Sequence, residues 1–278
     1  MKLKTWLEEA RKSLQEASPT PGLDAQILLI HELGKDKTWI LAHPNDELDS
    51  KKITSLQSQI DKAKQGEPIP YLIGHWEFYA LDFIISPDVL IPRPETEMMV
   101  DLALDWAKKR ENSQRILDVG TGSGCIAITL ALHSKDSLIV GVDSSANAVE
   151  IAQKNAQKFH VENRVQFQLS NLFSKVEGKF DVVCANLPYI PTSELSSLPV
   201  SKFEPLTALD GGEDGLTVIS SFLKEAGRFL NHPGLILCEH GMGQVDPIRK
   251  IAENHFPNSV GQTHKDLQGI PRLLSIQV

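Results

Sequence analysis

The sequence predicts an α/β fold, in which a mostly parallel seven-stranded sheet with an antiparallel edge follows a small helical bundle. Three observations support this prediction. Apolar residues recur at helical spacing from Leu3 to about Lys64. From Arg115 onward, short apolar segments alternate with helical ones, an order typical of parallel strands covered on both faces. The chain then closes with two strand-like segments, 259–262 and 272–278, joined by a short loop that contains glycine.

The amino-terminal bundle is expected to contain four helices. Their apolar stripes fall in residues 3–14, 23–30, 39–41 and 53–63. Glycines at positions 34 and 66 end the second and the fourth of these helices. We expect the leucine and aromatic side chains of the stripes to form a core rather than a ligand pocket.

The region after the bundle reads as a hairpin followed by a helix. Residues 76–85 have the aromatic and β-branched content of paired strands. Residues 91–97, Ile-Pro-Arg-Pro-Glu-Thr-Glu, lead into a helix over about 96–110, where prolines and acids suit the first turn. This capping role accounts for the acids but does not explain Arg93, which stands between two prolines.

The parallel part of the sheet is expected to use five apolar segments, at residues 116–119, 138–142, 165–169, 180–185 and 235–238. Helical segments separate most of them. Open α/β sheets bind their ligands at the carboxyl ends of the strands, so the residues directly after these segments are the candidates for a site.

Composition and charge narrow the class of protein. Hydrophobic residues make up 41% of the 278 residues, and no apolar run approaches the roughly 18 residues of a membrane span. The amino terminus lacks a signal-like apolar core, which predicts a cytoplasmic protein without a membrane partner.

The three cysteines lack metal or redox spacing and the nine histidines lack a ligand pattern, so we expect free thiols and no metal. A net charge of -8 disfavours direct binding to nucleic acid, and we expect a monomer.

A glycine-rich turn follows the first strand of the sheet. Residues 116–124 read Ile-Leu-Asp-Val-Gly-Thr-Gly-Ser-Gly, and glycines let the backbone approach a ligand closely. A P-loop lysine is absent, and Cys125 stands where a dinucleotide fingerprint has Gly or Ala. The pattern favours a ligand with an amino-acid end and a ribose, whose hydroxyls Asp143, about twenty residues later, can bind. The alternative is a tight turn in which Asp143 caps a helix.

A second signal is the tetrapeptide Asn186-Leu187-Pro188-Tyr189, which follows the strand at 180–185. The asparagine amide both accepts and donates, the proline stiffens the turn, and the tyrosine adds an aromatic face. This combination suits a flat, weakly nucleophilic nitrogen that is held by its hydrogens and covered by a ring. Taken alone, the four residues are equally compatible with an ordinary β-turn.

Together these features resemble the Rossmann-like class I methyltransferases that use S-adenosyl-L-methionine. The resemblance implies that Asp143 binds the ribose, that Asn171 and Leu172 flank the adenine, and that Asn186 borders the cofactor. The residues implied to lie under its methionine end are Gly120, Thr121, Gly122, Ser123 and Gly124.

The tetrapeptide resembles the Asn-Pro-Pro-Tyr motif of enzymes that methylate planar nitrogens, namely exocyclic amines of bases and glutamine amides. The lone pair of such a nitrogen is delocalised, so a general base helps little. The Asn186 oxygen and the carbonyl of Leu187 are expected to accept the two N–H groups, so that positioning and desolvation supply most of the acceleration. Tyr189 is expected to stack on the flat group, which makes Asn186 and Tyr189 the predicted catalytic residues.

The whole chain resembles the HemK/PrmC family, the protein-glutamine methyltransferases that modify peptide chain release factors. The resemblance rests on the bundle, the hairpin, residues 90–97, the glycine turn, the tetrapeptide and residues 203–209, Phe-Glu-Pro-Leu-Thr-Ala-Leu. It implies methylation of the side-chain nitrogen of the glutamine in the Gly-Gly-Gln loop of class I release factors, which modulates translation termination. The substrate residues that it implies are Arg93, Asn186, Leu187, Pro188, Tyr189 and Glu204.

The resemblance also implies three parts: a docking domain over residues 1–70, a linker hairpin over 71–92 and a catalytic domain over 93–278. Two segments depart from the family pattern. Leu187 replaces the usual proline, and Asn171-Leu172 replaces the more usual Asp-Trp near the adenine, which predicts lower cofactor affinity.

Two alternatives stay open. An adenine methyltransferase acting on nucleic acid would need base flipping and a basic surface, which the acidic chain does not suggest. A non-catalytic binding protein could keep the same fold. Binding of S-adenosylmethionine by the purified chain would distinguish this last alternative from an enzyme.

Overall fold

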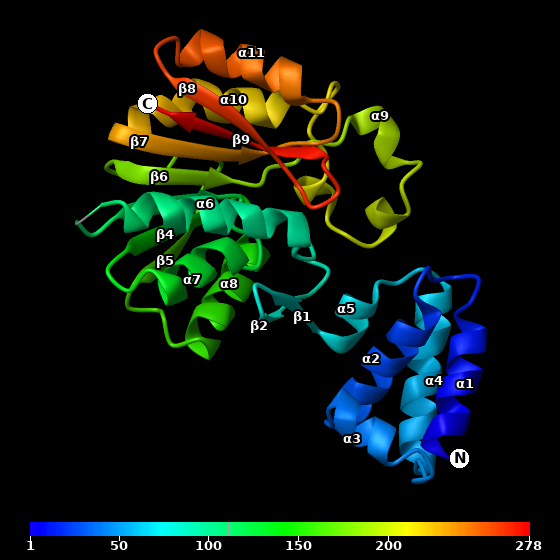
Figure 1. Ribbon diagram of the computed structural model, residues 1–278. Coiled ribbons are helices and arrows are strands. Elements are labelled where there is room, and N and C mark those ends of the chain that lie inside the picture. Colours follow the sequence, from blue (N-terminus) through cyan, green and yellow to red (C-terminus); the bar gives the residue numbers. More distant parts are fainter. Residues whose placement is uncertain (111) are drawn as a thin grey trace. The chain divides into compact units, whose positions relative to one another are not determined.

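The computed structural model describes residues 1–110 and 112–278 (Figure 1). The chain divides into two compact units, Met1–His75 and Trp76–Val278. No helix in the described ranges is long and apolar enough to cross a membrane.

The first unit is a bundle of helices. They are α1 (Leu3–Ser13), α2 (Pro21–Leu33), α3 (Lys37–Ala42), α4 (Ser50–Lys64) and α5 (Ile69–Ile73). The carboxylates of Asp36 and Asp49 accept the backbone N–H groups of Trp39 and Lys52, which caps α3 and α4. Most of the predicted stripe residues are buried, but Leu23 and Leu41 are 52% and 63% exposed. The expectation that they belong to the core is therefore wrong.

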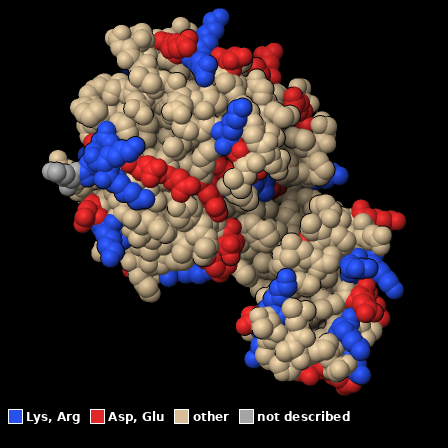
Figure 2. All heavy atoms as spheres, viewed as in Figure 1, with Lys and Arg blue, Asp and Glu red and all other residues tan. Residues whose placement is uncertain are grey.

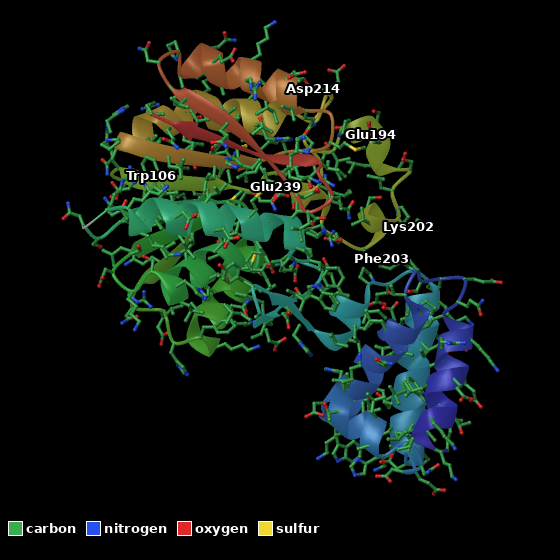
Figure 3. All side chains as sticks on the ribbon, viewed as in Figure 1. Trp106, Glu194, Lys202, Phe203, Asp214 and Glu239 are labelled. Atoms are coloured by element: carbon green, nitrogen blue, oxygen red, sulfur yellow. The ribbon has the colours of Figure 1, made fainter. Side chains whose placement is uncertain are left out.

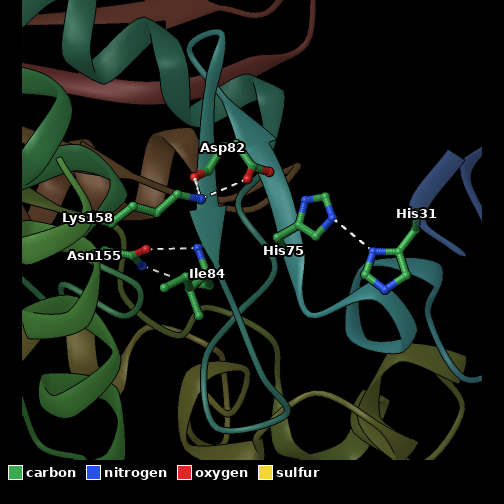
Figure 4. A network of polar contacts seen from close by, with 6 residues as sticks. All are labelled: His31, His75, Asp82, Ile84, Asn155 and Lys158. Atoms are coloured by element: carbon green, nitrogen blue, oxygen red, sulfur yellow. Dashed lines mark hydrogen bonds and ion pairs between the residues drawn. The ribbon is translucent and has the colours of Figure 1, made fainter. Parts of the chain in front are cut away.

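The predicted hairpin consists of β1 (His75–Phe78) and β2 (Leu81–Ile84). Both backbone groups of Ile84 bond to the Asn155 amide, at 2.8 and 2.9 Å, and Lys158 forms an ion pair with Asp82 at 2.8 Å (Figure 4). The Asn155 amide also donates to the carbonyl of Ser123 at 2.9 Å. A single buried asparagine thus joins the hairpin to the glycine-rich turn.

The second unit is built on a seven-stranded sheet with the order β5-β4-β3-β6-β7-β9-β8. Strands β3 to β7 run parallel, and β9 is antiparallel to both of its neighbours. This arrangement confirms the predicted parallel sheet with an antiparallel edge. The strands are β3 (Arg115–Val119), β4 (Leu138–Asp143), β5 (Val165–Leu169), β6 (Phe180–Ala185), β7 (Leu230–Glu239), β8 (Val260–Lys265) and β9 (Pro271–Gln277).

Helices cover both faces of this sheet, as Figure 1 shows. One face packs against α6 (Glu97–Lys108), α7 (Cys125–His133) and α8 (Ala146–Lys158). The other face packs against α10 (Thr217–Ala226) and α11 (Val245–His255). Two apolar cores result, one on each side, and together they hold the strand ends in fixed positions. Shorter helical segments connect these elements: η1 (Pro94–Thr96), α9 (Thr192–Leu195), η2 (Pro199–Lys202), η3 (Leu206–Ala208) and η4 (Gly227–Phe229).

The register of the sheet aligns four strand ends. Val119 pairs with Val142 on one side and with Ala185 on the other, and Ala185 pairs with Cys238. The residues one position further along therefore form a row at the carboxyl edge: Gly120, Asp143, Asn186 and Glu239. Because β3 has β4 on one side and β6 on the other, this row crosses the point where open α/β sheets bind ligands.

Candidate active site

A cavity of about 280 Å³ opens at the row of strand ends, and all of its lining comes from the second unit. The predicted site residues that line it are Arg93, Gly120, Thr121, Gly122, Ser123, Asp143, Asn171, Leu172, Asn186, Leu187 and Pro188. Three other predicted residues, Gly124, Tyr189 and Glu204, do not belong to this lining.

The glycine-rich turn has a backbone that only glycine adopts easily. Gly120, Gly122 and Gly124 have φ values of 76°, 55° and 80°. A Cβ atom on Gly122 would meet nothing within 4 Å, whereas one on Gly124 would lie 2.9 Å from the Phe167 ring. Gly122 thus leaves space on the cavity side, and Gly124 allows the turn to pack against β5.

Asp143 holds the turn from the neighbouring strand. Its two carboxylate oxygens accept the N–H groups of Gly122 and Ser145, each at 2.9 Å. Burial raises the pKa of Asp143, and these backbone bonds oppose the rise. The N-cap of α8 is Ser145, whose hydroxyl accepts from Ala148, so the alternative role of Asp143 as that helix's cap is not observed.

A buried carboxylate lies beneath the same turn. Asp118 is fully buried, and one of its oxygens accepts the hydroxyl of Thr121 at 2.6 Å. The other oxygen has no hydrogen-bond partner among the described residues. Burial raises the pKa of Asp118 to about 7. Asp118 does not line the cavity, but Gly120, Thr121 and Gly122 above it do, and their glycine backbone leaves room there for the amino-acid end of S-adenosylmethionine.

Asn186 is held in place by a hydroxyl group. Its side-chain nitrogen donates to the Thr96 oxygen at 3.0 Å, and the Thr96 hydroxyl donates to Glu239 at 2.7 Å. Within the described part of the chain, neither the Asn186 side-chain oxygen nor the Leu187 carbonyl accepts a hydrogen bond. These are the two acceptors expected to hold a planar NH2 group.

Hydrogen bonds to the backbone hold the end of the tetrapeptide and the residue that follows it. The Tyr189 carbonyl accepts from Gln244 at 2.8 Å, and Ile190 exchanges backbone bonds with Leu209 and Gly211. Burial and the nearby Glu239 carboxylate raise the pKa of Tyr189 to about 12, which keeps its phenol neutral. The tetrapeptide is therefore a fixed loop and not only a local turn.

Arg93 and Glu204, which the sequence placed at the substrate, form an ion pair with each other. Glu204 is 4% exposed and also accepts the backbone N–H of Ile91 at 3.1 Å. The pair joins the segment before α6 to the segment around η2 and η3. Arg93 itself lines the cavity, so Glu204 fixes a cation at its edge.

Sequence reasoning assigned no role to Thr96 and did not single out Glu239. The sequence did contain a signal for Glu239, because this residue ends a buried apolar strand just as Asp143 ends β4. Thr96 lies in the Pro-Glu-Thr-Glu segment, which was read as a helix start and as part of the family resemblance. Among the described residues, no cluster of His, Cys, Asp and Glu could hold a metal ion.

The doubly wound sheet, the glycine-rich turn over Asp118 and the carboxylate at the end of β4 define a class I methyltransferase that uses S-adenosylmethionine. A methyltransferase domain model matches residues 110–273, and a PrmC N-terminal domain model matches residues 5–74. The chain belongs to the release factor glutamine methyltransferase family, as predicted.

Individual proteins support this assignment. The release factor glutamine methyltransferase of Koribacter versatilis is 38% identical over 99% of this chain and 98% of its own. The Escherichia coli protein of the same name is 39% identical over 90% of each chain. The crystal structure of a methyltransferase from Pyrococcus furiosus has a TM-score of 0.54 at 17% identity and covers 82% of this chain and 98% of its own. That last likeness shows a shared fold.

Proposed function

We propose that this protein transfers the methyl group of S-adenosylmethionine to the side-chain nitrogen of the glutamine in the Gly-Gly-Gln loop of a class I release factor. The observation that carries the proposal is the pair of unpaired acceptors, the Asn186 side-chain oxygen and the Leu187 carbonyl, at the cavity. Two acceptors can hold both hydrogens of one primary amide.

The cofactor supplies a methyl carbon bound to a positively charged sulfur. When bound, the cofactor would supply this carbon to the amide nitrogen, the electron pair of the sulfur–carbon bond would stay on sulfur, and the displaced N–H proton would pass to water. The protein's contribution is to hold the amide hydrogens on Asn186 and Leu187, so that the nitrogen lone pair faces the methyl group. Bonds to both hydrogens favour the pyramidal nitrogen of the transition state more than the planar ground state.

The walls of the cavity favour this arrangement by limiting water. Leu187 is buried, and its side chain lies over Gly120: a Cβ atom there would be 3.1 Å from the Leu187 Cδ2. The leucine that departs from the family motif therefore packs against the turn, while its carbonyl keeps the proposed role. Pro188 lines the same cavity and restricts Leu187 to an extended backbone.

Recognition of the release factor is proposed for the helical unit, since its sequence matches the PrmC N-terminal domain. We further propose that the protein acts as a monomer in the cytoplasm, where release factors, its proposed substrates, function. We do not propose direct binding to nucleic acid, because the exposed side of α6 would repel a phosphate backbone. This helix carries Glu97, Asp101 and Asp105, and Figure 2 shows a row of acidic side chains over it.

The proposal is tested by incubating a release factor with the protein and S-adenosylmethionine and measuring the intact mass and the peptide masses. We expect the addition of one methyl group to the loop glutamine. A release factor with that glutamine changed to alanine is the matched control and should gain nothing. Binding of the cofactor without any methylated glutamine would contradict the proposal.

A further inference from the structure

A buried chain of two hydrogen bonds, here called the relay, connects Asn186 to Thr96 and Thr96 to Glu239. Thr96 and Glu239 are 2% and 3% exposed, and the Thr96 hydroxyl lies between Glu239 at 2.7 Å and the Asn186 side-chain nitrogen at 3.0 Å. Thr96 comes from the segment that starts α6, Asn186 follows β6, and Glu239 ends β7. Figure 3 shows Glu239 at this edge of the sheet, next to the start of α6.

The polarity of the relay follows from the groups that it contains. A carboxylate only accepts hydrogen bonds, and a hydroxyl has a single hydrogen to give. With Glu239 ionised, Thr96 must donate to it and can only accept from Asn186. Asn186 therefore turns its NH2 group toward Thr96, which leaves its oxygen for another donor.

We propose that Thr96 and Glu239 are positioning residues, which fix the amide of Asn186 with its oxygen toward the substrate by means of the Glu239 charge. This inference rests on the proposed function, in which that oxygen holds a hydrogen of the substrate amide. Neither residue needs to touch the reacting atoms. Together they disfavour the flipped orientation of the Asn186 amide, in which the NH2 group of Asn186 would face the NH2 group of the substrate.

Protonation of Glu239 removes this constraint. A carboxylic acid can donate to the Thr96 oxygen, the freed hydroxyl hydrogen can turn toward Asn186, and both amide orientations become possible. Burial raises the pKa of Glu239 to about 7, so the ionised relay is present above that pH and is lost as the pH falls through it.

Other groups around Glu239 do not change the direction in which the relay depends on pH. The nearby charged or titratable side chains are Glu95, Arg93, Arg272, Tyr189 and Cys238. Glu95 raises the pKa of Glu239, and the two arginines lower it. The Tyr189 phenol and the Cys238 thiol have pKa values of about 12 and stay neutral when Glu239 titrates.

The first test compares kcat, the KM for release factor and cofactor binding in matched variants. Thr96→Val should lower kcat by about tenfold to a hundredfold, the scale of removing an outer hydrogen-bond partner, and leave the dissociation constant of the cofactor unchanged. Thr96→Ser should restore the activity. Thr129→Val is the control, because Thr129 is equally buried but its hydroxyl has no partner among the described residues. An unchanged kcat in Thr96→Val overturns the inference.

The second test is the pH profile. In the wild-type protein, kcat should rise with pH through about 7. In Glu239→Gln this acid limb should disappear, because glutamine carries no proton that is lost in this range. If the acid limb of kcat persists in Glu239→Gln, another group causes it, and the inference is overturned.

A third measurement does not depend on the substrate. The side-chain NH2 resonance of Asn186, assigned by its absence in Asn186→Ala, should shift with a midpoint near the pKa of about 7 and stay constant in Glu239→Gln. If this shift is seen but no glutamine is methylated, the proposed function fails and the relay stands. If glutamine is methylated but the resonance does not titrate, the relay fails and the function stands.

Discussion

The contact between the glycine-rich turn and the tetrapeptide can be tested by changing Gly120 to alanine. Gly120 has a φ of 76°, and an added Cβ atom would lie 3.1 Å from Leu187 Cδ2 and 3.3 Å from the Asn186 carbonyl oxygen. Gly122 is a matched control. Its φ is 55°, but a Cβ atom there would meet nothing within 4 Å.

The expected loss of stability has two parts. The left-handed backbone costs an alanine about 1–2 kcal/mol, and the lower entropy of the unfolded chain offsets about 0.4–1 kcal/mol of that. This part, about 1 kcal/mol, is common to both variants. Gly120→Ala must also displace the buried Leu187 from its rotamer, which costs about 0.5–1.5 kcal/mol more. We therefore expect Gly120→Ala to destabilise the protein by about 2 kcal/mol and Gly122→Ala by about half as much.

Urea unfolding without cofactor measures both values, and a double-mutant cycle with Leu187→Ala isolates the contact. The cycle should give a favourable coupling of about 1 kcal/mol, because the shorter side chain relieves the overlap. Equal destabilisation of the two glycine variants, together with no coupling to Leu187, would refute the packing of the turn against the tetrapeptide.

Three further substitutions test the roles of single residues. Asn186→Ala should leave cofactor binding nearly intact and lower methyl transfer by at least about a hundredfold, which an assay with labelled methyl donor would show; near-wild-type turnover would contradict its role. Asp143→Ala should mainly weaken cofactor binding, because it removes the carboxylate predicted to bind the ribose and the acceptor that holds Gly122; an unchanged dissociation constant in calorimetry would argue against a ribose contact. Leu187→Pro should change the rate by less than about threefold, because the proposed role uses only its carbonyl, so a large gain in kcat would mean that leucine is a handicap.

Much of the fold was predictable because its signals are local. The five parallel strands and the antiparallel edge were predicted from short apolar runs and the glycine-rich turn from the spacing of its glycines, and the structure confirms them. The first half of β7 was missed, since residues 231–234, Asn-His-Pro-Gly, look like a turn although they belong to a strand. Leu23 and Leu41 fitted helical stripes, yet they face solvent. Periodicity identifies an apolar face without showing what covers it.

The candidate site was predictable in those parts that sequence neighbours create. The turn and the tetrapeptide each form from consecutive residues, and the cavity unites most of them. The relay behind Asn186 could not be found in this way, because Thr96 and Glu239 are 143 positions apart and meet only through the order of the strands. The pairing of Arg93 with Glu204 is equally non-local, although both segments had been noticed.

The central claim is that the Asn186 oxygen and the Leu187 carbonyl hold a glutamine amide for methylation. Peptide mass analysis of a release factor treated with the wild-type protein and with Asn186→Ala tests it most directly. The account predicts one added methyl group on the loop glutamine with the wild-type protein and almost none with the variant. Methylation of any other residue, or equal methylation by both proteins, would contradict it.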